Sequence, residues 1–265
     1  MSISIYHDDC IKYMDLLDDS TIDCILTDPP YLTTDLQFDR DGIDIEGLCN
    51  NILRVLKPNG YFISFGGIEL LGQLCQYFPV RWTGVWIKPN GVMRSSVAKK
   101  PRSQSELYAV MAHPKYKVSD LTYNKMYLEG EPYRSVQRKQ EIKRGGKDCL
   151  SRINTSAWGK DGYVIENNGT REQTDVIYAP NKQSMVLTER TDHPTQKPLS
   201  LLKTLLYMCT NEKDLVLDPF CGSGSTAIAC HEMNRSCITI EKDNNYYLIA
   251  RKRISQAMEQ QRLAL

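Results

Sequence analysis

The sequence predicts an α/β fold with a doubly wound, mostly parallel sheet, and three observations support that fold class. Short apolar runs rich in β-branched residues alternate with segments that carry apolar residues at helical spacing. Two of the strand-like runs lead into an acidic residue and a proline turn, at Asp28 and Asp218. The chain has 265 residues, of which 41% are hydrophobic, so it can bury a sizeable core.

The elements are expected in alternating order along the chain. The first part is predicted to form strands over 2–6, 22–26, 61–65, 82–87 and 107–111, with helices over 10–17, 45–57 and 68–77. The last part is predicted to form helices over 199–209, 226–233 and 245–260, with strands over 215–217 and 237–240. The Lys-Pro-Asn-Gly stretch at 57–60 is expected to stop a helix, and Pro198 is expected in the first turn of another.

The alternation weakens between about residues 113 and 190, where glycine, polar and basic residues dominate. Such a stretch is too long for an ordinary loop, so we expect an inserted module, with a mobile basic loop at 143–147. Residues 88–152 carry 15 Lys/Arg against 6 Asp/Glu, whereas residues 1–87 carry 5 against 13. Tyrosines interleave the basic block, which indicates polyanion binding, with a solvated basic surface as the alternative.

Two protein classes are excluded by what the sequence lacks. No apolar run approaches the ~20 residues of a membrane span, and the first residues show no secretory pattern. The nine cysteines include no Cys-x-x-Cys pair and fall mostly in apolar runs. We therefore expect reduced thiols in a cytosolic protein, with neither a disulfide framework nor a zinc site.

The most informative local motif is Thr27-Asp28-Pro29-Pro30-Tyr31, directly after an expected strand. Neither proline donates a backbone hydrogen bond, and each holds φ near about −65°, so the turn is stiff. It places a carboxylate and an aromatic ring at a strand's carboxyl end, where open α/β sheets bind ligands. The carboxylate and a proline-flanked carbonyl can both accept hydrogen bonds from one NH2 group, and the phenol ring can stack on a flat heterocycle. An ordinary strand-ending turn is the alternative.

A second turn, Asp218-Pro-Phe-Cys-Gly222-Ser-Gly224-Ser-Thr226, lies between a strand and a helix. Glycines let the backbone approach a ligand, and the helix start offers N–H groups to a carboxylate or phosphate. Glu241 ends the next strand, where an acidic residue commonly holds a ribose, so we predict a nucleoside cofactor. The glycine spacing also fits a dinucleotide site loosely, which leaves NAD open, whereas the absence of Gly-Lys-Ser/Thr excludes a P-loop.

Local sequence leaves two roles open for Asp9, which follows the first expected strand. Its carboxylate can accept from an amino group or a sugar hydroxyl of a ligand. It can equally be the N-cap of the next helix.

The motifs D-P-P-Y, H-P-T-Q-K-P (193–198) and D-P-F-C-G-S-G-S-T together resemble those of the amino-group DNA methyltransferases that use S-adenosyl-L-methionine. The order of D-P-P-Y, a variable basic stretch and the cofactor motif is similar to the permuted arrangement called the beta class. The resemblance covers about residues 1–112 and 191–265. It implies a Rossmann-like permuted methyltransferase fold, with a catalytic half (1–112), a target-recognition insertion (113–190) and a cofactor-binding half (191–265).

The resemblance also implies roles for the matched residues. Asp28 and the Pro29 carbonyl, in the turn that Pro30 stiffens, would accept hydrogen bonds from the target amino group, and Tyr31 would stack on the base. Glu241 would hold the cofactor ribose, and Asp9 would contact its adenine, which favours the ligand role for Asp9. The implied cofactor-binding set is Asp9, Cys10, Thr195, Lys197, Asp218, Phe220, Gly222, Gly224, Ser225, Glu241 and Lys242. No metal is implied.

The implied substrate is double-stranded DNA with the target base flipped out of the helix. In this family the first motif position is often Asp for adenine and Ser for cytosine, so Asp28 favours N6-adenine methylation. N4-cytosine or RNA methylation, an inactive DNA-binding relative, and an NAD-dependent reductase are the alternatives. The implied setting is the cytoplasm of a bacterial or phage-carrying cell, and the sequence decides neither a homodimer nor a cognate restriction nuclease.

Overall fold

The computed structural model describes residues 2–30, 43–90, 99, 101–137 and 163–263. Tyr31 and the basic loop expected at 143–147 lie outside the described residues, so the expectations for them stay predictions. The chain forms two compact units, one of Met1–Lys125 with Thr174–Leu265 and one of Met126–Gln173.

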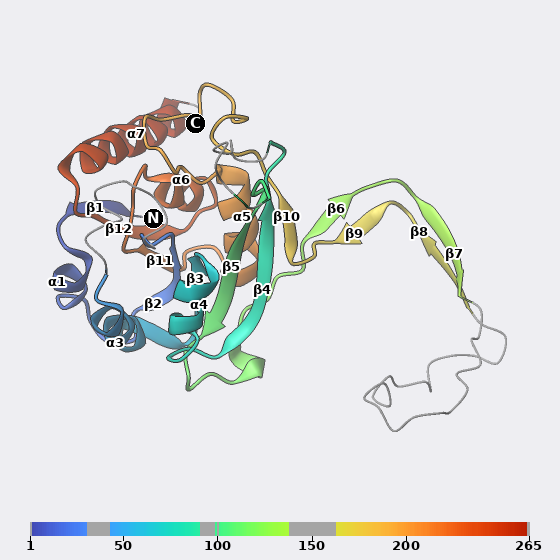
Figure 1. The fold of residues 1–265 in the computed structure, drawn as a ribbon, viewed down its shortest axis with the longest axis horizontal. Helices are drawn as coiled ribbons and strands as arrows, with labels where there is room; N and C mark the ends of the chain where they lie inside the picture. The colour runs from blue at the N-terminus through green and yellow to red at the C-terminus, as the bar shows by residue number, and fades with distance from the viewer. Residues whose placement is uncertain (1, 31–42, 91–98, 100, 138–162, 264–265) are drawn as a thin grey trace. The chain divides into compact units, whose positions relative to one another are not determined.

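The larger unit contains an eight-stranded sheet with the order β1-β12-β11-β2-β3-β5-β4-β10 (Figure 1). Its strands are β1 (Ile3–His7), β2 (Ile22–Thr27), β3 (Leu56–Phe65), β4 (Val80–Ile87), β5 (Ser105–Ala112), β10 (Val176–Tyr178), β11 (Leu215–Asp218) and β12 (Ser236–Glu241). All neighbouring strands are parallel except the two pairs that β5 forms with β3 and β4. This confirms the predicted mostly parallel sheet.

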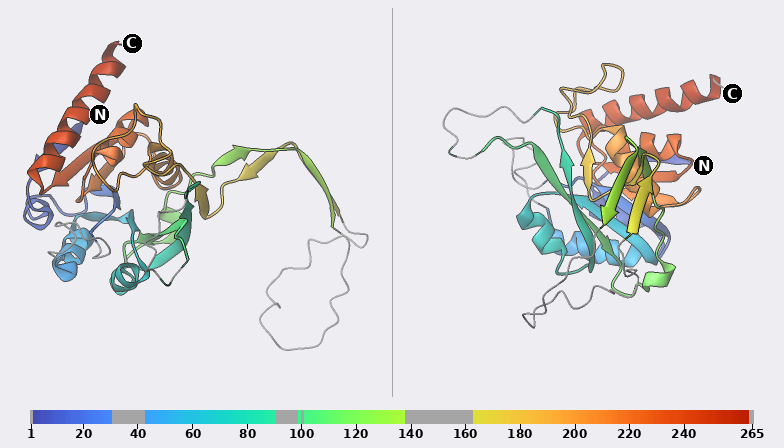
Figure 2. Two further views of the ribbon diagram at one scale, coloured as in Figure 1. Left: turned by 45° about the horizontal axis from the view of Figure 1, so that its top comes forward. Right: turned by 90° about the vertical axis from the view of Figure 1, so that its right-hand side faces the viewer.

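Helices form two groups, and Figure 2 shows them on opposite faces of the sheet. Helices α1, α3 and α4 contact one another in series, and helices α5, α6 and α7 do the same. In the described part of this unit the helical segments are α1 (Cys10–Met14), α3 (Ile45–Val55), α4 (Ile68–Leu74), α5 (Leu199–Cys209), α6 (Ser225–Glu232), α7 (Asn244–Leu263) and the short 3-10 turn η1 (Val118–Asp120). Coverage of both faces confirms the doubly wound arrangement.

Helix α3 illustrates how local sequence and burial agree. The Asp44 carboxylate caps the helix by accepting from Gly47 N at 2.9 Å. Its apolar positions Leu48, Ile52 and Val55 are fully buried and belong to one core cluster with residues of β2, β3 and β5. The stripe at helical spacing thus becomes the face that packs on the sheet.

Three segments differ from the sequence expectation. The helix expected over 10–17 ends at Met14. The helix before 57–60 ends as expected, at Val55, but Leu56 already begins β3, so Lys-Pro-Asn-Gly lies within a strand whose pairing with β2 is irregular. Strand β10 falls inside the expected 113–190 insertion, yet it pairs with β4 in the large sheet.

The described residues of the smaller unit, 126–137 and 163–173, form two antiparallel strand pairs. Strand β6 (Tyr127–Glu129) pairs with β9 (Thr170–Glu172), and β7 (Tyr133–Gln137) pairs with β8 (Tyr163–Asn167). A role of this unit in target recognition stays a prediction. Among all described residues, no helix combines the length and the apolar character that crossing a bilayer requires.

Candidate active site

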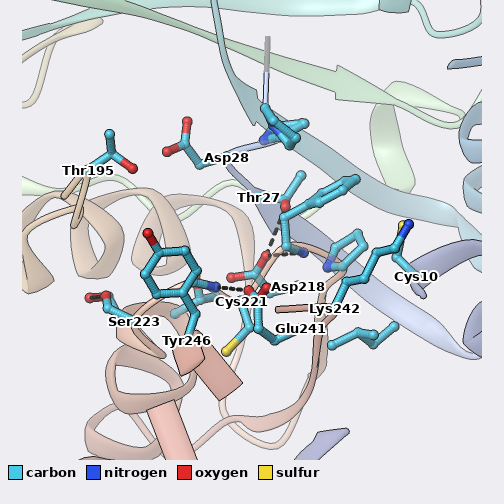
Figure 3. Close-up of a pocket in the computed structure, with 18 of the residues that line it drawn as sticks. Cys10, Thr27, Asp28, Thr195, Asp218, Cys221, Ser223, Glu241, Lys242 and Tyr246 are labelled. Atoms are coloured by element: carbon cyan, nitrogen blue, oxygen red, sulfur yellow. Dashed lines mark hydrogen bonds between the residues drawn. The ribbon is translucent and has the colours of Figure 1, made fainter. Parts of the chain in front are cut away.

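The pocket lies at the carboxyl ends of neighbouring parallel strands and has a volume of about 700 Å³. Asp9, Asp28, Asp218 and Glu241 line it and stand at or just beyond the ends of β1, β2, β11 and β12. Figure 3 shows Asp28, Asp218 and Glu241 in the pocket. Strands β2 and β11 are neighbours in the sheet, and the strand that follows each one lies on the opposite side of this pair: β3 next to β2, and β12 next to β11. Such a switch point is where open α/β sheets bind ligands.

The pocket gathers nearly all the site residues predicted from the sequence. Those that line it are Asp9, Cys10, Asp28, Pro29, Pro30, Thr195, Lys197, Asp218, Phe220, Gly222, Ser225, Glu241 and Lys242. Tyr31 lies outside the described residues. Gly224 is not among the lining residues: its φ is +78°, and a Cβ there would lie 3.2 Å from Ala250 Cβ in α7. The lack of a side chain at Gly224 therefore allows the turn to pack against α7.

Asp218 connects the two proline turns. The buried Thr27 hydroxyl donates to Asp218 Oδ1 at 2.8 Å, and Phe220 N donates to the same oxygen at 3.1 Å. Burial raises the pKa of Asp218, although the hydrogen bonds from Thr226 and Thr27 oppose that shift. The carboxylate thus fixes the tip of β2 against the start of the glycine turn.

Glu241 closes the glycine turn from the other side. Gly222 has φ of +52°, and its N–H donates to Glu241 Oε2 at 2.7 Å, while Asp243 N donates to Oε1 at 2.9 Å. Burial raises the pKa of Glu241. Each carboxylate oxygen keeps a second lone pair, so the side chain can still accept from ribose hydroxyls in the pocket.

Asp9 has the N-cap role that the sequence left open. Its Oδ1 accepts from Ile11 N at 3.1 Å and from Lys12 N at 3.4 Å at the start of α1. Its Oδ2 lies 3.3 Å from the Lys242 ammonium. Burial opposes ionisation, but the helix N–H groups and Lys242 lower the pKa of Asp9 overall. Because the side chain also lines the pocket, capping leaves room for a ligand contact.

Asp28 has an unusual environment for a carboxylate. The Lys197 ammonium donates to its Oδ2, whereas Oδ1 is buried and, among the described residues, has no hydrogen-bond partner. Burial raises the pKa of Asp28 to about 6, with Lys197 opposing the shift and Glu106 adding to it. Lys197, which was expected near the cofactor, therefore lies on the predicted catalytic carboxylate as well as on the pocket wall.

Some residues in the pocket wall or behind it were not predicted from the sequence: His193 and Tyr246 line the pocket, and Arg253 contacts the lining residue Ser225. His193 is buried beneath the glycine turn with its ring 4.4 Å from that of Tyr246, and burial lowers the pKa of His193 to about 4. Arg253 Nη1 donates to Ser225 Oγ at 2.9 Å and so holds the turn from α7. His193 stands inside the quoted H-P-T-Q-K-P motif, which could have identified it. Tyr246 and Arg253 gave no signal, because they lie in an ordinary helix far along the chain.

The pocket suits a nucleoside that carries an amino acid side arm. Its volume lies within the ~300–1,000 Å³ typical of small-molecule sites. Carboxylates that can accept from hydroxyl or amino groups line it at Asp9 and Glu241, and Asp28 adds an oxygen to which no described residue donates. Among the described residues, no three His, Cys, Asp or Glu side chains gather as a metal site would require.

Comparison with known proteins identifies the family. Residues 22–252 match the family model N6_N4_Mtase, described as DNA methylase. The Type II methyltransferase M.HpaI of Haemophilus parainfluenzae is 29% identical over 262 residues, covering 92% of this chain and 71% of that protein. The putative methylase YubD of Escherichia coli (strain K12) is 27% identical over 264 residues, covering 95% and 91%.

Solved structures show the same fold. The complex of M1.HpyAVI with SAM superposes with a TM-score of 0.60 at 24% identity, covering 95% of this chain and 99% of that one. The PvuII DNA methyltransferase, named cytosine-N4-specific, gives a TM-score of 0.63 at 14% identity, covering 98% and 91%. The match of the family model over most of the chain establishes that it belongs to the DNA methylase (N6_N4_Mtase) family, which confirms the amino-methyltransferase resemblance and the S-adenosyl-L-methionine cofactor predicted from the sequence.

Proposed function

We propose that this DNA methyltransferase transfers a methyl group to the exocyclic N6 amino group of an adenine flipped out of double-stranded DNA. The observation that carries the proposal is the Asp28 carboxylate, which lines the pocket and keeps one buried oxygen that no other described residue contacts by a hydrogen bond. An unsatisfied buried acceptor is costly to leave unpaired. A ligand N–H satisfies it, so Asp28 is suited to receive an amino hydrogen.

The chemical difficulty explains why an acceptor is needed. The lone pair of a nucleobase amine is delocalised into the ring, which makes the amine a poor nucleophile. Asp28 and the Pro29 carbonyl accept hydrogen bonds from its two N–H groups and draw these hydrogens out of the ring plane, which favours a tetrahedral nitrogen. The methylated nitrogen gains positive charge and then releases one of these protons. When bound, S-adenosyl-L-methionine supplies an activated sulfonium methyl group. The protein therefore contributes mainly alignment and electrostatic stabilisation.

The remaining lining residues divide into those that hold the cofactor and those that hold the base. Glu241 is assigned to the ribose hydroxyls and Asp9 to the adenine of the cofactor. The turn from Asp218 to Ser225 is assigned to the methionine arm, because α6 begins there and the start of a helix favours a carboxylate. Tyr31 is assigned to the flipped base, where stacking contributes about 1–3 kcal/mol.

Adenine is preferred over cytosine because the first motif position is Asp28. Both bases present the same amidine-like NH2, so N4-cytosine methylation is the second candidate. One structural neighbour is named cytosine-N4-specific, although at 14% identity it indicates the fold alone. An inactive DNA-binding relative is disfavoured, since Asp28, Pro29 and the glycine turn are all intact.

The DNA partner is assigned to the basic block at 88–152, with phosphate contacts that should weaken steeply with salt. We assign target recognition to the 113–190 region, which includes the small unit of paired strands. A cognate restriction nuclease is suggested by relatives named Type II methyltransferases. Action in the cytoplasm completes the proposal.

Digestion of treated nucleic acid to nucleosides tests the proposed base. Duplex DNA, single-stranded DNA and RNA would each be incubated with the protein and methyl-labelled cofactor, then digested and analysed by mass spectrometry. We expect labelled N6-methyl-2′-deoxyadenosine from duplex DNA. Labelled N4-methyl-2′-deoxycytidine would establish the second candidate, and label confined to RNA would overturn both.

A further inference from the structure

Four charged side chains from four separate segments form an alternating line that ends at Asp28. The line runs from Lys88, just after β4, through Glu106 in β5 and Lys197, just before α5, to Asp28, just after β2. Lys88 Nζ lies 2.8 Å from Glu106 Oε2, and Lys197 Nζ lies 2.7 Å from Glu106 Oε1. Lys197 then donates to Asp28 Oδ2. We call these residues the charge line.

The charge line is largely withdrawn from solvent. The side chains of Lys88, Glu106 and Lys197 are 12%, 14% and 8% exposed, and that of Asp28 is 21% exposed. Removing charges from water is costly, and apolar residues of similar size often stabilise a fold as well or better. Fold stability is therefore a weak explanation for the charge line. Because the line ends at Asp28 in the pocket, a role in the reaction is a better one.

Two aromatic rings fix the ammonium groups of the charge line. Lys197 Nζ lies 5.0 Å from the centre of the Phe65 ring, and Lys88 Nζ lies 4.6 Å from that of Trp86. Trp86 is itself held by the hydrogen bond from its Nε1 to Ala179 O at 2.9 Å. Lys197 thus has a defined position, with carboxylates on two sides and a ring on a third.

The charged neighbours of Asp28 act in opposite directions on the ionisation of its carboxyl group. Lys197, Glu106 and Asp218 are the charged groups that act on Asp28 among the described residues, and neighbouring His193 is neutral because burial lowers its pKa. Lys197 favours the ionised form of Asp28, whereas Glu106 and Asp218 disfavour it. For Glu106, burial alone would raise the pKa, but Lys197 and Lys88 together lower it. The Glu106 carboxylate is thus kept charged and shares the Lys197 ammonium with Asp28.

We propose that Lys88 and Glu106 are positioning residues for methyl transfer. Together they hold Lys197 where its ammonium keeps Asp28 charged yet occupies only Oδ2, so that Oδ1 stays available to the target amino group. This inference rests on the proposed function of Asp28 and extends it to two residues that do not line the pocket.

The test measures the pKa of the Asp28 carboxyl directly, by carbon NMR of protein with labelled aspartate. The Asp28→Asn variant assigns the signal. Glu106→Gln removes a negative neighbour and should lower the pKa of Asp28. Lys88→Met leaves Glu106 less neutralised and should raise it. Lys197→Met should raise it most, and Lys197→Arg should restore part of the wild-type value. Lys203→Met, which removes a half-exposed ion pair with Glu232, is the matched control and should change nothing.

Kinetics complete the test. Glu106→Gln should lower the single-turnover methylation rate at least about tenfold, which corresponds to about 1.4 kcal/mol, and shift the acid limb of the pH profile down. The cofactor Kd should stay close to wild type. The melting temperature should fall, because Glu106→Gln leaves the buried Lys88 and Lys197 ammonium groups without a counter-charge that they share. Lys88→Arg should recover activity that Lys88→Met loses.

The outcomes separate this inference from the proposed function. An unchanged Asp28 titration across the variants, with wild-type methylation intact, would overturn the charge line alone. A rate loss in Glu106→Gln that follows entirely from weaker cofactor binding would also overturn it. A wild-type protein that methylates no DNA while the predicted order of pKa values holds would overturn the proposed function and the role in methyl transfer, and leave the electrostatic coupling standing.

Discussion

The Thr27 hydroxyl donates to Asp218 Oδ1 at 2.8 Å, across 191 residues of sequence, and so joins the tips of the two neighbouring strands that carry the proline turns. Strand β2 ends in the turn assigned to the target amine, and β11 ends in the turn assigned to the cofactor. Because parallel pairing places both tips at one edge, a single buried hydrogen bond sets their separation. Methyl transfer depends on that separation, since in-line displacement tolerates little misalignment.

Thr27→Val tests this connection with little change in shape. Asp218 loses its Thr27 donor while it stays buried, so we expect unfolding to become easier by about 1–3 kcal/mol. The single-turnover methylation rate should fall more than cofactor affinity does. Thr204→Val, which removes a hydroxyl bonded to Ser200 O within α5, is the control for loss of a mostly buried hydroxyl. Equal rate losses in the two variants would contradict the role of Thr27.

Gly222→Ala should weaken cofactor binding. An L-residue at the observed φ of +52° costs about 1–2 kcal/mol, and the new Cβ would lie 2.9 Å from His193 Nε2. Calorimetry with S-adenosyl-L-homocysteine should show a Kd raised about tenfold or more, in line with that cost. Gly72→Ala in α4 meets nothing within 4 Å and should leave the Kd unchanged while stabilising the fold by about 0.5–1 kcal/mol.

Asp28→Asn should remove a pH dependence of stability along with activity. Burial raises the pKa of Asp28 from 3.8 to about 6, so the folded protein binds this proton more tightly than the unfolded chain does, although the carboxyl is still ionised at neutral pH. The stability from this group is fully present below pH 3.8 and is lost as the pH rises through about 6. An asparagine cannot titrate. The melting temperature of the variant should therefore rise relative to that of wild type as the pH increases from acid to neutral.

Thermal unfolding curves across that range measure the gain. Asp19→Asn, at a carboxylate that is 74% exposed, is the control for loss of a charge. Melting temperatures of wild type and Asp28→Asn that run parallel with pH, or converge toward neutral pH, would contradict the raised pKa.

Substitutions of Asp9 separate its N-cap role from its ligand role. Asp9→Ser keeps a capping oxygen for α1, so stability should change by less than about 0.5 kcal/mol. The same variant loses the carboxylate that lines the pocket, so cofactor affinity should fall. Asp9→Ala should lose both affinity and about 1 kcal/mol of stability. An Asp9→Ser protein with wild-type affinity would show that Asp9 only caps the helix.

What could be predicted from the sequence was local. The strand over 22–26, the helix over 199–209 and the two proline turns follow from contiguous residues, and the structure places both turns at the pocket. The antiparallel direction of β5 could not be predicted, because apolar alternation carries no information about strand direction. Gly224 was assigned to the cofactor, since a glycine pattern does not reveal whether the missing side chain admits a ligand or a helix.

The charge line shows the limit most clearly. Lys197 and Asp28 are 169 residues apart, and only the fold brings them together. Glu106 is the one charged residue near the start of the mostly apolar strand β5, so the sequence alone suggests a solvent-exposed strand end. The structure shows instead that its side chain is largely buried. Lys88 directly follows β4, and a functional reason for this lysine emerges once its partner Glu106 is located.

A crystal structure with sinefungin, an S-adenosyl-L-methionine analogue with an amine in place of the methyl-sulfonium group, tests the central claim most directly. We predict that its ribose hydroxyls contact Glu241 and that its amine points toward the Asp28 turn, with room between them for a base edge. Sinefungin bound outside this pocket, or inside it with the amine directed away from Asp28, would contradict the proposed methyl transfer.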